Sequence, residues 1–297
     1  MNTPVDPQYL AGPAALDALT QLANRCRLEQ PFAAGLEAAD LHWWARLDER
    51  DEPWRCAVWT DHAGPCAAVF VTRMARADTI DVMRSASAPS VDELRPHVAA
   101  ALDRMDTGRT VDAWAADDDS ETIGLWQSLG LADTGEALFE CWLPADDRRP
   151  VGELPGGFSV RNRTQLDGPH HLALRSGPLA EERLRATALY RPELDLAVVR
   201  DSDHTIAAYA VFWADPVTGV GLVEPVRTEA EFSGQGFASH LVRAGVDLLA
   251  TAGCTRCKVL HEADNEAAAR AYARAGFVQY ARDLTFARNA MPAPADA

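Results

Sequence analysis

The residues best suited to do chemistry lie at positions 226–239, in the sequence VRTEAEFSGQGFAS. Gly234 and Gly236 leave room for a polyanion to approach the main chain. The helical pattern that begins at Phe237 adds the partial positive charge of a helix N-terminus, and the hydroxyl of Ser239 would lie in its first turn. This arrangement predicts a phosphate-binding loop, although a plain turn that needs glycines would look the same.

The elements that must position this loop form a regular series in the second half of the chain. Gly253 and Gly276 stand where the C-cap glycines of two helices belong. Alternating and 3.6-residue apolar patterns predict strands at 158–161, 195–200, 205–213, 220–228, 258–261 and 279–286, and helices at 179–190, 237–252 and 266–275.

The first half of the chain repeats this order of elements. Trp126 precedes Gly130 as Tyr272 precedes Gly276, at an offset of 146 residues, and the same offset pairs Asp119 with Asn265. This regularity predicts an internal duplication. The strands expected here lie at 55–59, 67–73, 79–83, 110–114 and 138–142, and the helices at 91–105 and 121–129.

A change of composition separates the two halves. Prolines, glycines and clustered charges fill residues 148–156 and predict a linker. We therefore expect one domain over residues 1–147 and a second over residues 157–297.

The glycine loop resembles motif A of the GNAT superfamily, in which Gln or Arg is followed by two residues, Gly, one residue and then Gly or Ala. Gly236 and Ala238 match the last two positions, whereas Ser233 stands where Gln or Arg is usual. Further on, DNEAAARAYARAGF at 264–277 resembles motif B, the family's Asn…Ala…Tyr…Gly-Phe signature. The resemblance implies an α/β fold of two tandem GNAT-like domains, each a mixed, mostly antiparallel sheet flanked by helices.

The resemblance also implies that acetyl-CoA binds at this loop as a co-substrate. A backbone N–H between Val226 and Thr228 would donate to the thioester oxygen, and the loop would hold the pyrophosphate. The residues implied in binding are Val226, Arg227, Thr228, Ser233, Gly234, Gln235, Gly236, Phe237, Ala238, Ser239 and Asn265.

Two side chains are implied in catalysis. Family members commonly protonate the departing thiolate from the motif B tyrosine, which is Tyr272 here; its alternative role is that of a helix aromatic packed on the sheet. Glu224, just upstream on the strand, is the expected general base, directly or through a water. It could equally bind substrate or be a surface charge at a strand edge. Glu229 and Glu231 are weaker candidates because they belong to the loop.

The first half lacks these features. The 146-residue offset places SAPSVDE, at 87–93, opposite the glycine loop. Pro89 has no N–H to donate, and Asp92 and Glu93 would repel a pyrophosphate. Trp126 replaces the tyrosine, and an indole N–H is not a usable acid. We predict a degenerate copy that binds no coenzyme, so that each chain holds one.

Charge and composition exclude several classes of function. The net charge of −16, with Lys258 as the single lysine, argues against a nucleic-acid partner. No apolar run is long enough for a membrane span, and no secretory signal is expected. Six dispersed cysteines indicate reduced thiols in the cytoplasm.

A metal site is not expected. Cys254 and Cys257 form a lone CxxC without a second pair. His170 and His171, as neighbours, are expected to point in different directions. The acidic run at 117–119 is expected to be a solvated loop.

The function that the resemblance implies is transfer of an acetyl group from acetyl-CoA to the primary amine of a small molecule, by a monomer or homodimer. Two alternatives remain open. One is a protein acetyltransferase that acts on a lysine or an N-terminus. The other is a non-catalytic, acyl-CoA-binding regulatory module, which the departure at Ser233 makes conceivable.

Overall fold

The computed structural model describes residues 6–47, 52, 55–74, 77–105 and 108–289. The chain forms two compact units, which are described separately. The first unit comprises Met1–Leu138 and Ala281–Ala297, and the second comprises Phe139–Tyr280. Among the described residues, no helix is both long and apolar enough to cross a membrane.

The first unit is built on a sheet with the strand order β1-β2-β3-β4-β5-β12. β4 and β5 run parallel, and the other pairs whose register is resolved are antiparallel. The strands are β1 Gln8–Tyr9, β2 Cys56–Asp61, β3 Gly64–Arg73, β4 Ala77–Arg84, β5 Thr110–Ala116 and β12 Val278–Arg288.

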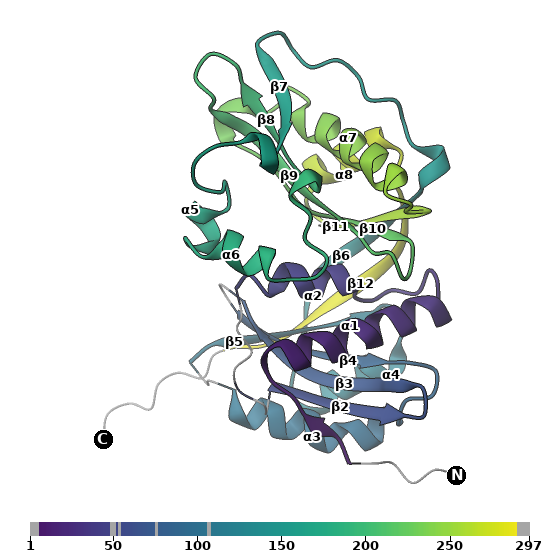
Figure 1. Cartoon of the computed structure of the whole chain (residues 1–297). Coiled ribbons are helices and arrows are strands. Elements are labelled where there is room, and N and C mark those ends of the chain that lie inside the picture. The colour runs from purple at the N-terminus through teal and green to yellow at the C-terminus, as the bar shows by residue number, and fades with distance from the viewer. Residues whose placement is uncertain (1–5, 48–51, 53–54, 75–76, 106–107, 290–297) are drawn as a thin grey trace. The chain divides into compact units, whose positions relative to one another are not determined.

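Helices cover both faces of this sheet (Figure 1). α3 and α4 bury one row of apolar side chains against it, and α1 lies against β3 and β4 on the other face. α1 lines up its apolar residues Ala15, Leu19, Leu22 and Ala23 at helical spacing. The helices are α1 Gly12–Glu29, α2 Ala38–Trp44, α3 Val91–Arg104 and α4 Ser120–Ser128.

The second unit has the strand order β6-β11-β10-β9-β8-β7. β10 and β11 are parallel, whereas β7, β8, β9 and β10 pair antiparallel. The strands are β6 Ala132–Pro144, β7 Phe158–Asn162, β8 Asp195–Arg200, β9 Ile206–Ala214, β10 Val220–Thr228 and β11 Arg256–Glu262. The helices are α5 Ala173–Ser176, α6 Ala180–Arg185, α7 Phe237–Thr251 and α8 Glu266–Ala275.

α7 packs closely on the sheet because two glycines remove side chains from the interface. A Cβ added at Gly245 would lie 2.1 Å from the ring of Phe212, and one at Gly221 would lie 2.6 Å from Leu249. Leu241, Val242, Val246 and Leu249 fill the rest of this interface and are fully buried. The helix that follows the glycine loop is thus held firmly on β9 and β10.

The two halves of the sequence exchange strands. β12, from the second half, pairs with β5 in the first unit, from Asp283↔Ala116 to Arg288↔Val111. Residues 139–144 of β6, from the first half, belong to the second unit, where β6 lies beside β11. The compact units therefore differ from the linear domains expected on either side of residues 148–156.

A buried ion pair joins β6 to β11 in the second unit. Glu140 of β6 accepts a hydrogen bond from Lys258 of β11 at 2.7 Å, and both side chains are 0% exposed. Breaking such a pair by removing one partner costs about 3–5 kcal/mol, because the remaining charge stays buried. β6 is therefore an integral strand of the second unit.

The duplication predicted from the sequence is visible in the elements. β5 and β11, α3 and α7, and α4 and α8 each begin 146 residues apart. The helix expected at 179–190 is wrong: α6 ends at Arg185, and the chain continues through a loop to β8. α1 and α2 were not predicted at all.

Candidate active site

The candidate site begins where two parallel strands of the second unit separate. Paired residues of β10 and β11 run from Val220↔Arg256 to Leu222↔Lys258, although β10 continues to Thr228 and β11 to Glu262. Backbone groups of β10 beyond Leu222 are thus released on the β11 side. The expected thioester-binding segment, Val226 to Thr228, lies on this released part.

Glu224 is placed by an irregularity on the other side of β10. The register with β9 shifts between Val223 and Val226, so Glu224 and Pro225 form a bulge. Pro225 has no N–H for a ladder, and bulges are where a strand tolerates proline. The indole of Trp213 donates to the Glu224 carbonyl at 2.7 Å, which fixes the backbone of this half-buried glutamate.

The glycine loop leads into a helix whose N-terminus is open. Gly236 is the N-cap residue of α7, with φ 83°, and no side chain caps the helix or places an acid in its first turn. Ser233, Gly234, Gln235 and Gly236 are all exposed. The first N–H groups of a helix lack intrahelical partners, so this end of α7 offers donors and partial positive charge to an anion.

Three predicted binding residues have side chains that are engaged elsewhere. Phe237 is buried against Phe158, with ring centroids 4.7 Å apart. The Ser239 hydroxyl donates to the Ala271 carbonyl over a long 3.5 Å, and the Asn265 side chain accepts from the Ala268 N–H at 3.0 Å as the cap of α8. Any contact of Phe237 or Ser239 with a coenzyme would therefore come mainly from the backbone.

Of the remaining predicted residues, Arg227 is the one with a charged side chain. It is exposed on β10 and lies 3.6 Å from Glu229. Glu229 also accepts from Arg175 at 2.9 Å. Glu229, named above as a weaker base, is thus occupied by two arginines.

Tyr272 lies on α8 with 7% of its surface exposed. Burial, the carboxylate of Glu224 and the thiol of Cys141 raise the pKa of Tyr272 above that of a free phenol. Within the described part of the chain, its hydroxyl forms no hydrogen bond. The phenol is therefore protonated, close to Glu224 and unengaged, as a general acid must be.

Sequence reasoning missed three neighbours of Tyr272. The ring of His261, on β11, lies 5.9 Å from that of Tyr272, and the ring of Phe139 lies 5.7 Å from His261. Cys141 follows two residues after Phe139 on β6. Two of these residues belong to the exchanged strand, so their position could not be read from the second half alone. His261 could have been noticed as a histidine in the apolar row of a strand.

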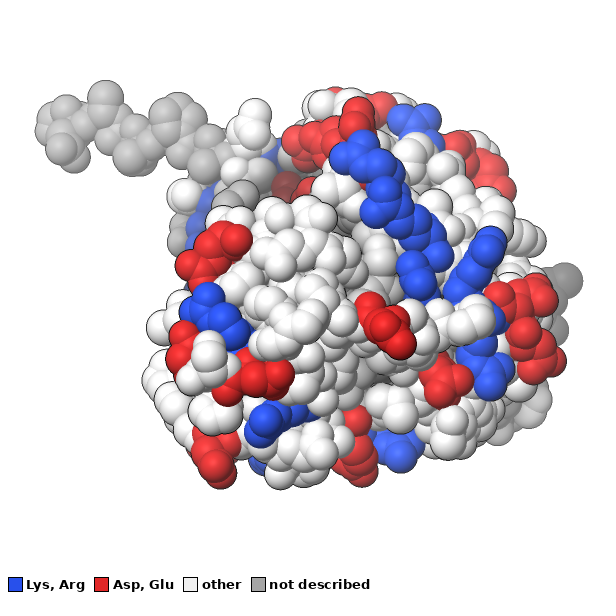
Figure 2. All heavy atoms as spheres, turned by 90° about the horizontal axis from the view of Figure 1, so that it is seen from above, with Lys and Arg blue, Asp and Glu red and all other residues white. Residues whose placement is uncertain are grey.

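The charged surface is not uniformly acidic. Figure 2 shows acidic and basic side chains interspersed, with some of the basic ones in a short stripe on this face. Lys258 is the single lysine and is fully buried, so the basic side chains on the surface are arginines. Although the net charge is −16, exposed arginines are therefore available to interact with an anion.

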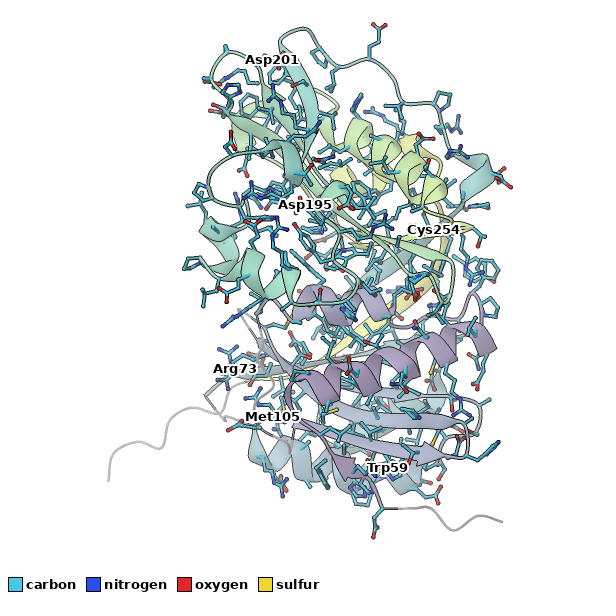
Figure 3. All side chains as sticks on the ribbon, viewed as in Figure 1. Trp59, Arg73, Met105, Asp195, Asp201 and Cys254 are labelled. Atoms are coloured by element: carbon cyan, nitrogen blue, oxygen red, sulfur yellow. The ribbon has the colours of Figure 1, made fainter. Side chains whose placement is uncertain are left out.

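The prediction for His170 and His171 was wrong, because the structure brings both rings to Asp195. The Leu172 N–H donates to His170 Nδ1 at 3.1 Å, which leaves Nε2 to donate to Asp195 at 2.7 Å. His171 Nε2 lies 3.3 Å from the second oxygen of Asp195. Tyr190 also donates to Asp195 at 2.7 Å. Figure 3 shows Asp195 inside the second unit and Asp201 at its periphery.

This cluster has the residue types of a metal site, but both ring nitrogens of His170 are already used. The rings of His170 and His171 are tilted by 33°, with centroids 4.1 Å apart. Nδ1 of His170 accepts from the Leu172 N–H and its Nε2 donates to Asp195, so neither nitrogen of this ring keeps a free lone pair for a metal. We interpret the cluster as a buried hydrogen-bonded support for the β7–β8 connection.

The CxxC pair is also unsuited to a metal. Cys254 and Cys257 are buried free thiols, and burial raises their pKa values to about 11 and about 12. Ligating cysteines must lose their protons, which these surroundings oppose. In the acidic run, Asp119 caps α4 by accepting from the Thr122 N–H at 3.0 Å.

Comparisons with known proteins identify an acetyltransferase family in the second half of the chain. The acetyltransferase (GNAT) family matches residues 166–277. A mycothiol acetyltransferase of Clavibacter michiganensis subsp. michiganensis is 29% identical over 197 residues, which are 61% of this chain and 63% of the relative. One of Saccharopolyspora erythraea is 29% identical over 204 residues, 64% of this chain and 66% of the relative. The chain thus spans less than two thirds of the length of either relative.

Solved structures match over nearly the whole chain. A tandem GNAT protein from the clavulanic acid biosynthesis pathway has a TM-score of 0.66 at 17% identity and covers 97% of this chain and 98% of its own. A GCN5-related N-acetyltransferase from Sphaerobacter thermophilus has a TM-score of 0.64 at 16% identity, with coverages of 97% and 96%. Residues 166–277 thus match the GNAT acetyltransferase family, and the whole chain has the fold of a tandem GNAT protein, with two GNAT-like domains.

Proposed function

We propose that the protein transfers an acetyl group from acetyl-CoA to the primary amine of a small molecule, in the second unit. The observation that carries this proposal is the joint position of an uncapped helix N-terminus and an unengaged, protonated Tyr272 beside Glu224, where β10 and β11 separate. The first feature suits a pyrophosphate and the second suits a departing thiolate.

The residues divide the chemistry between them. Glu224, directly or through a water, takes a proton from the acceptor ammonium so that a neutral amine can attack. A backbone N–H of residues 226–228 stabilises the oxygen that becomes negative as the C–N bond forms. When the C–S bond breaks, Tyr272 protonates the sulfur. A neighbouring general acid of this kind contributes about 10²–10⁴-fold to a rate.

The acceptor class is inferred from the relatives. They are named mycothiol acetyltransferases, which favours a small-molecule amine over a lysine or a protein N-terminus. The departure at Ser233 is the one feature that favours the non-catalytic alternative, because the expected Gln or Arg side chain is missing from the loop.

The test is thiol release from acetyl-CoA with a panel of small amines and a panel of peptides. We expect release with one or more small amines, and a loss of about 100-fold in kcat in Tyr272→Phe with little change in acetyl-CoA affinity. Glu224→Gln should also lower kcat. Release with peptides only would contradict the acceptor class. Calorimetric binding of acetyl-CoA without any release would favour the non-catalytic module.

A further inference from the structure

His261 occupies an unusual place for a histidine. Side chains alternate along a strand, so Cys257, Val259 and His261 share one face of β11. The first two are fully buried core residues, whereas His261 is half-buried. In the first half, Ala115 stands 146 residues before His261 and is 6% exposed. The degenerate copy thus lacks both this histidine and the tyrosine beside it.

The imidazole is held between two aromatic side chains. Its centroid lies 5.7 Å from Phe139 and 5.9 Å from Tyr272. The ring planes of His261 and Tyr272 are inclined by 40°. His261 is half-buried, so part of its side chain is accessible to solvent.

One hydrogen bond defines the tautomer. Nδ1 of His261 lies 2.8 Å from the carbonyl oxygen of Glu262. A carbonyl oxygen only accepts, so Nδ1 carries the hydrogen and donates it. In the neutral ring, Nε2 is therefore unprotonated and can take up a proton.

Tyr272 needs such a neighbour if it acts as a general acid. Burial and the nearby Glu224 make its phenolate unfavourable, since they raise its pKa. A phenol that has given its proton to the thiolate must regain one before the next turnover. A group that lies between Tyr272 and solvent can supply it independently of Glu224, which is taking protons from the amine.

We propose that His261 is a positioning residue for proton exchange, which returns a proton from solvent to the Tyr272 oxygen. This inference rests on the acetyl-transfer function proposed above. Nε2 takes a proton from solvent, forming the imidazolium, and passes it through a bridging water to the phenolate, which restores the neutral ring and the phenol. The ammonium loses two protons in all, through Glu224 to solvent, and the sulfur gains one from Tyr272. One proton is released per acetyl group transferred.

The decisive variant is His261→Ala, assayed with the best amine from the panel. We expect kcat to fall by about tenfold or more, with KM for acetyl-CoA changed less than about twofold. Added imidazole should restore part of kcat in a saturable manner. Pyrazole, which has nearly the same shape but is far less basic, should not. His204→Asn, on the exposed turn after β8, is the matched control and should retain wild-type kcat.

A second variant and a double variant separate proton exchange from packing. His261→Gln keeps a polar side chain of similar size without a titratable nitrogen. It replaces His261→Ala in the assay if the alanine variant folds poorly, and the same loss of kcat is expected. In the Tyr272→Phe background, His261→Ala should cause little further loss, because both changes interrupt one step. Rescue by both imidazole and pyrazole, rescue by neither, or fully additive losses would overturn the proposal while leaving acetyl transfer intact.

A readout without turnover keeps this test separate from that of the function. Nitrogen NMR of the full-length protein should show the ring of His261 with its hydrogen on Nδ1. A dominant Nε2–H form would refute the proposal, whatever the enzyme's activity. If the wild-type protein released no thiol with any amine, the proposed function would fail instead.

Discussion

The starts of α3 and α7 occupy equivalent positions in the two halves and differ in whether their N–H groups are free. At α3, Ser90 accepts from the Glu93 N–H, and the Glu93 side chain accepts from the Ser90 N–H, so the helix caps itself. At α7, Gly236 replaces Ser90, Ser239 replaces Glu93, and no side-chain cap is formed. The same fold thus closes one helix end with its own carboxylate and leaves the other open for an external anion.

The pair Trp126 and Tyr272 shows the same contrast. Trp126 is fully buried, and its indole donates to the Trp114 carbonyl at 3.0 Å. Tyr272 has no such partner within the described residues. In both places the first half satisfies internally a group that the second half keeps available. The two halves thus share a fold and differ in which of these groups are left without an internal partner.

The largest effect on acetyl-CoA affinity is expected when the capping residues of α3 are introduced at the start of α7. Gly236→Ser with Ser239→Glu would place the two residues of the α3 capping box in α7. To form that box, the backbone at position 236 must leave its φ of 83° for the extended conformation of Ser90, which distorts the loop, occupies the free N–H groups and puts a carboxylate beside the pyrophosphate. Losing two charge-assisted hydrogen bonds and adding one repulsion amounts to about 4 kcal/mol or more, so acetyl-CoA affinity should fall by about 1,000-fold.

Calorimetry measures this effect, and the reciprocal change is its control. Ser90→Gly with Glu93→Ser should leave acetyl-CoA affinity unchanged, with one molecule bound per chain before and after. Two bound molecules in the wild-type chain would contradict the view that the first half is degenerate, and undiminished affinity in the capped α7 would remove the loop from the binding site.

A second difference lies in the segments that precede the central strands. In the first unit, Arg27 and Glu37 form a buried pair with a 3.1 Å hydrogen bond. In the second unit, the corresponding support is His171 near Asp195. Burial chiefly lowers the pKa of His171 to about 4, so its protonation must couple to stability in this unit.

The direction in which pH changes the free energy of unfolding follows from the protonation of His171 in the folded and unfolded chain. Above about pH 6.5, His171 is neutral whether folded or unfolded, and the native support is complete. As the pH falls from about 6.5 to about 4, the unfolded chain binds a proton that the folded chain does not, so about 3 kcal/mol is lost. Urea unfolding at several pH values should show this loss in the wild type and little of it in His171→Gln. Equal losses in both proteins would show that His171 is not responsible.

The smallest effect is expected at Trp126. Trp126→Phe removes the indole donor and leaves the Trp114 carbonyl without that bond, so the free energy of unfolding should fall by about 1–2 kcal/mol. Turnover should stay at the wild-type level, in contrast to Tyr272→Phe. Denaturant unfolding and thiol-release assays on the two variants test this difference. A fall in kcat for folded Trp126→Phe would contradict the view that only the second half takes part in catalysis.

Local patterns were predictable where one segment decides its own structure. The strands at 195–200 and 220–228 and the helix at 266–275 agree with β8, β10 and α8. The helix at 179–190 failed because its last residues enter a loop that is held by tertiary contacts to Asp195. α1 has a readable apolar stripe at Ala15, Leu19, Leu22 and Ala23, and the signal was overlooked.

The surroundings of the candidate site were less predictable for a topological reason. The segments of β6 and β12 each follow a helix that ends at a glycine, and their side-chain alternation is the same whichever sheet receives them. The sequence of these segments therefore does not predict that Phe139, Glu140 and Cys141 join the second unit. The approach of His171 to Asp195 likewise depends on how a loop folds back, which periodicity does not encode.

The exchange of strands has a consequence for how the protein is made. A chain leaves the ribosome from its N-terminus, so β5 is synthesised long before β12, its neighbour in the finished sheet. Until the last residues appear, the β12 side of β5 lacks its native partner, and an unpaired strand edge invites association with other chains. The first unit can thus reach its native sheet only once the second half has been translated, although most of its residues precede the second unit in the sequence. Nascent chains stalled before residue 278 should need protection that the complete chain does not.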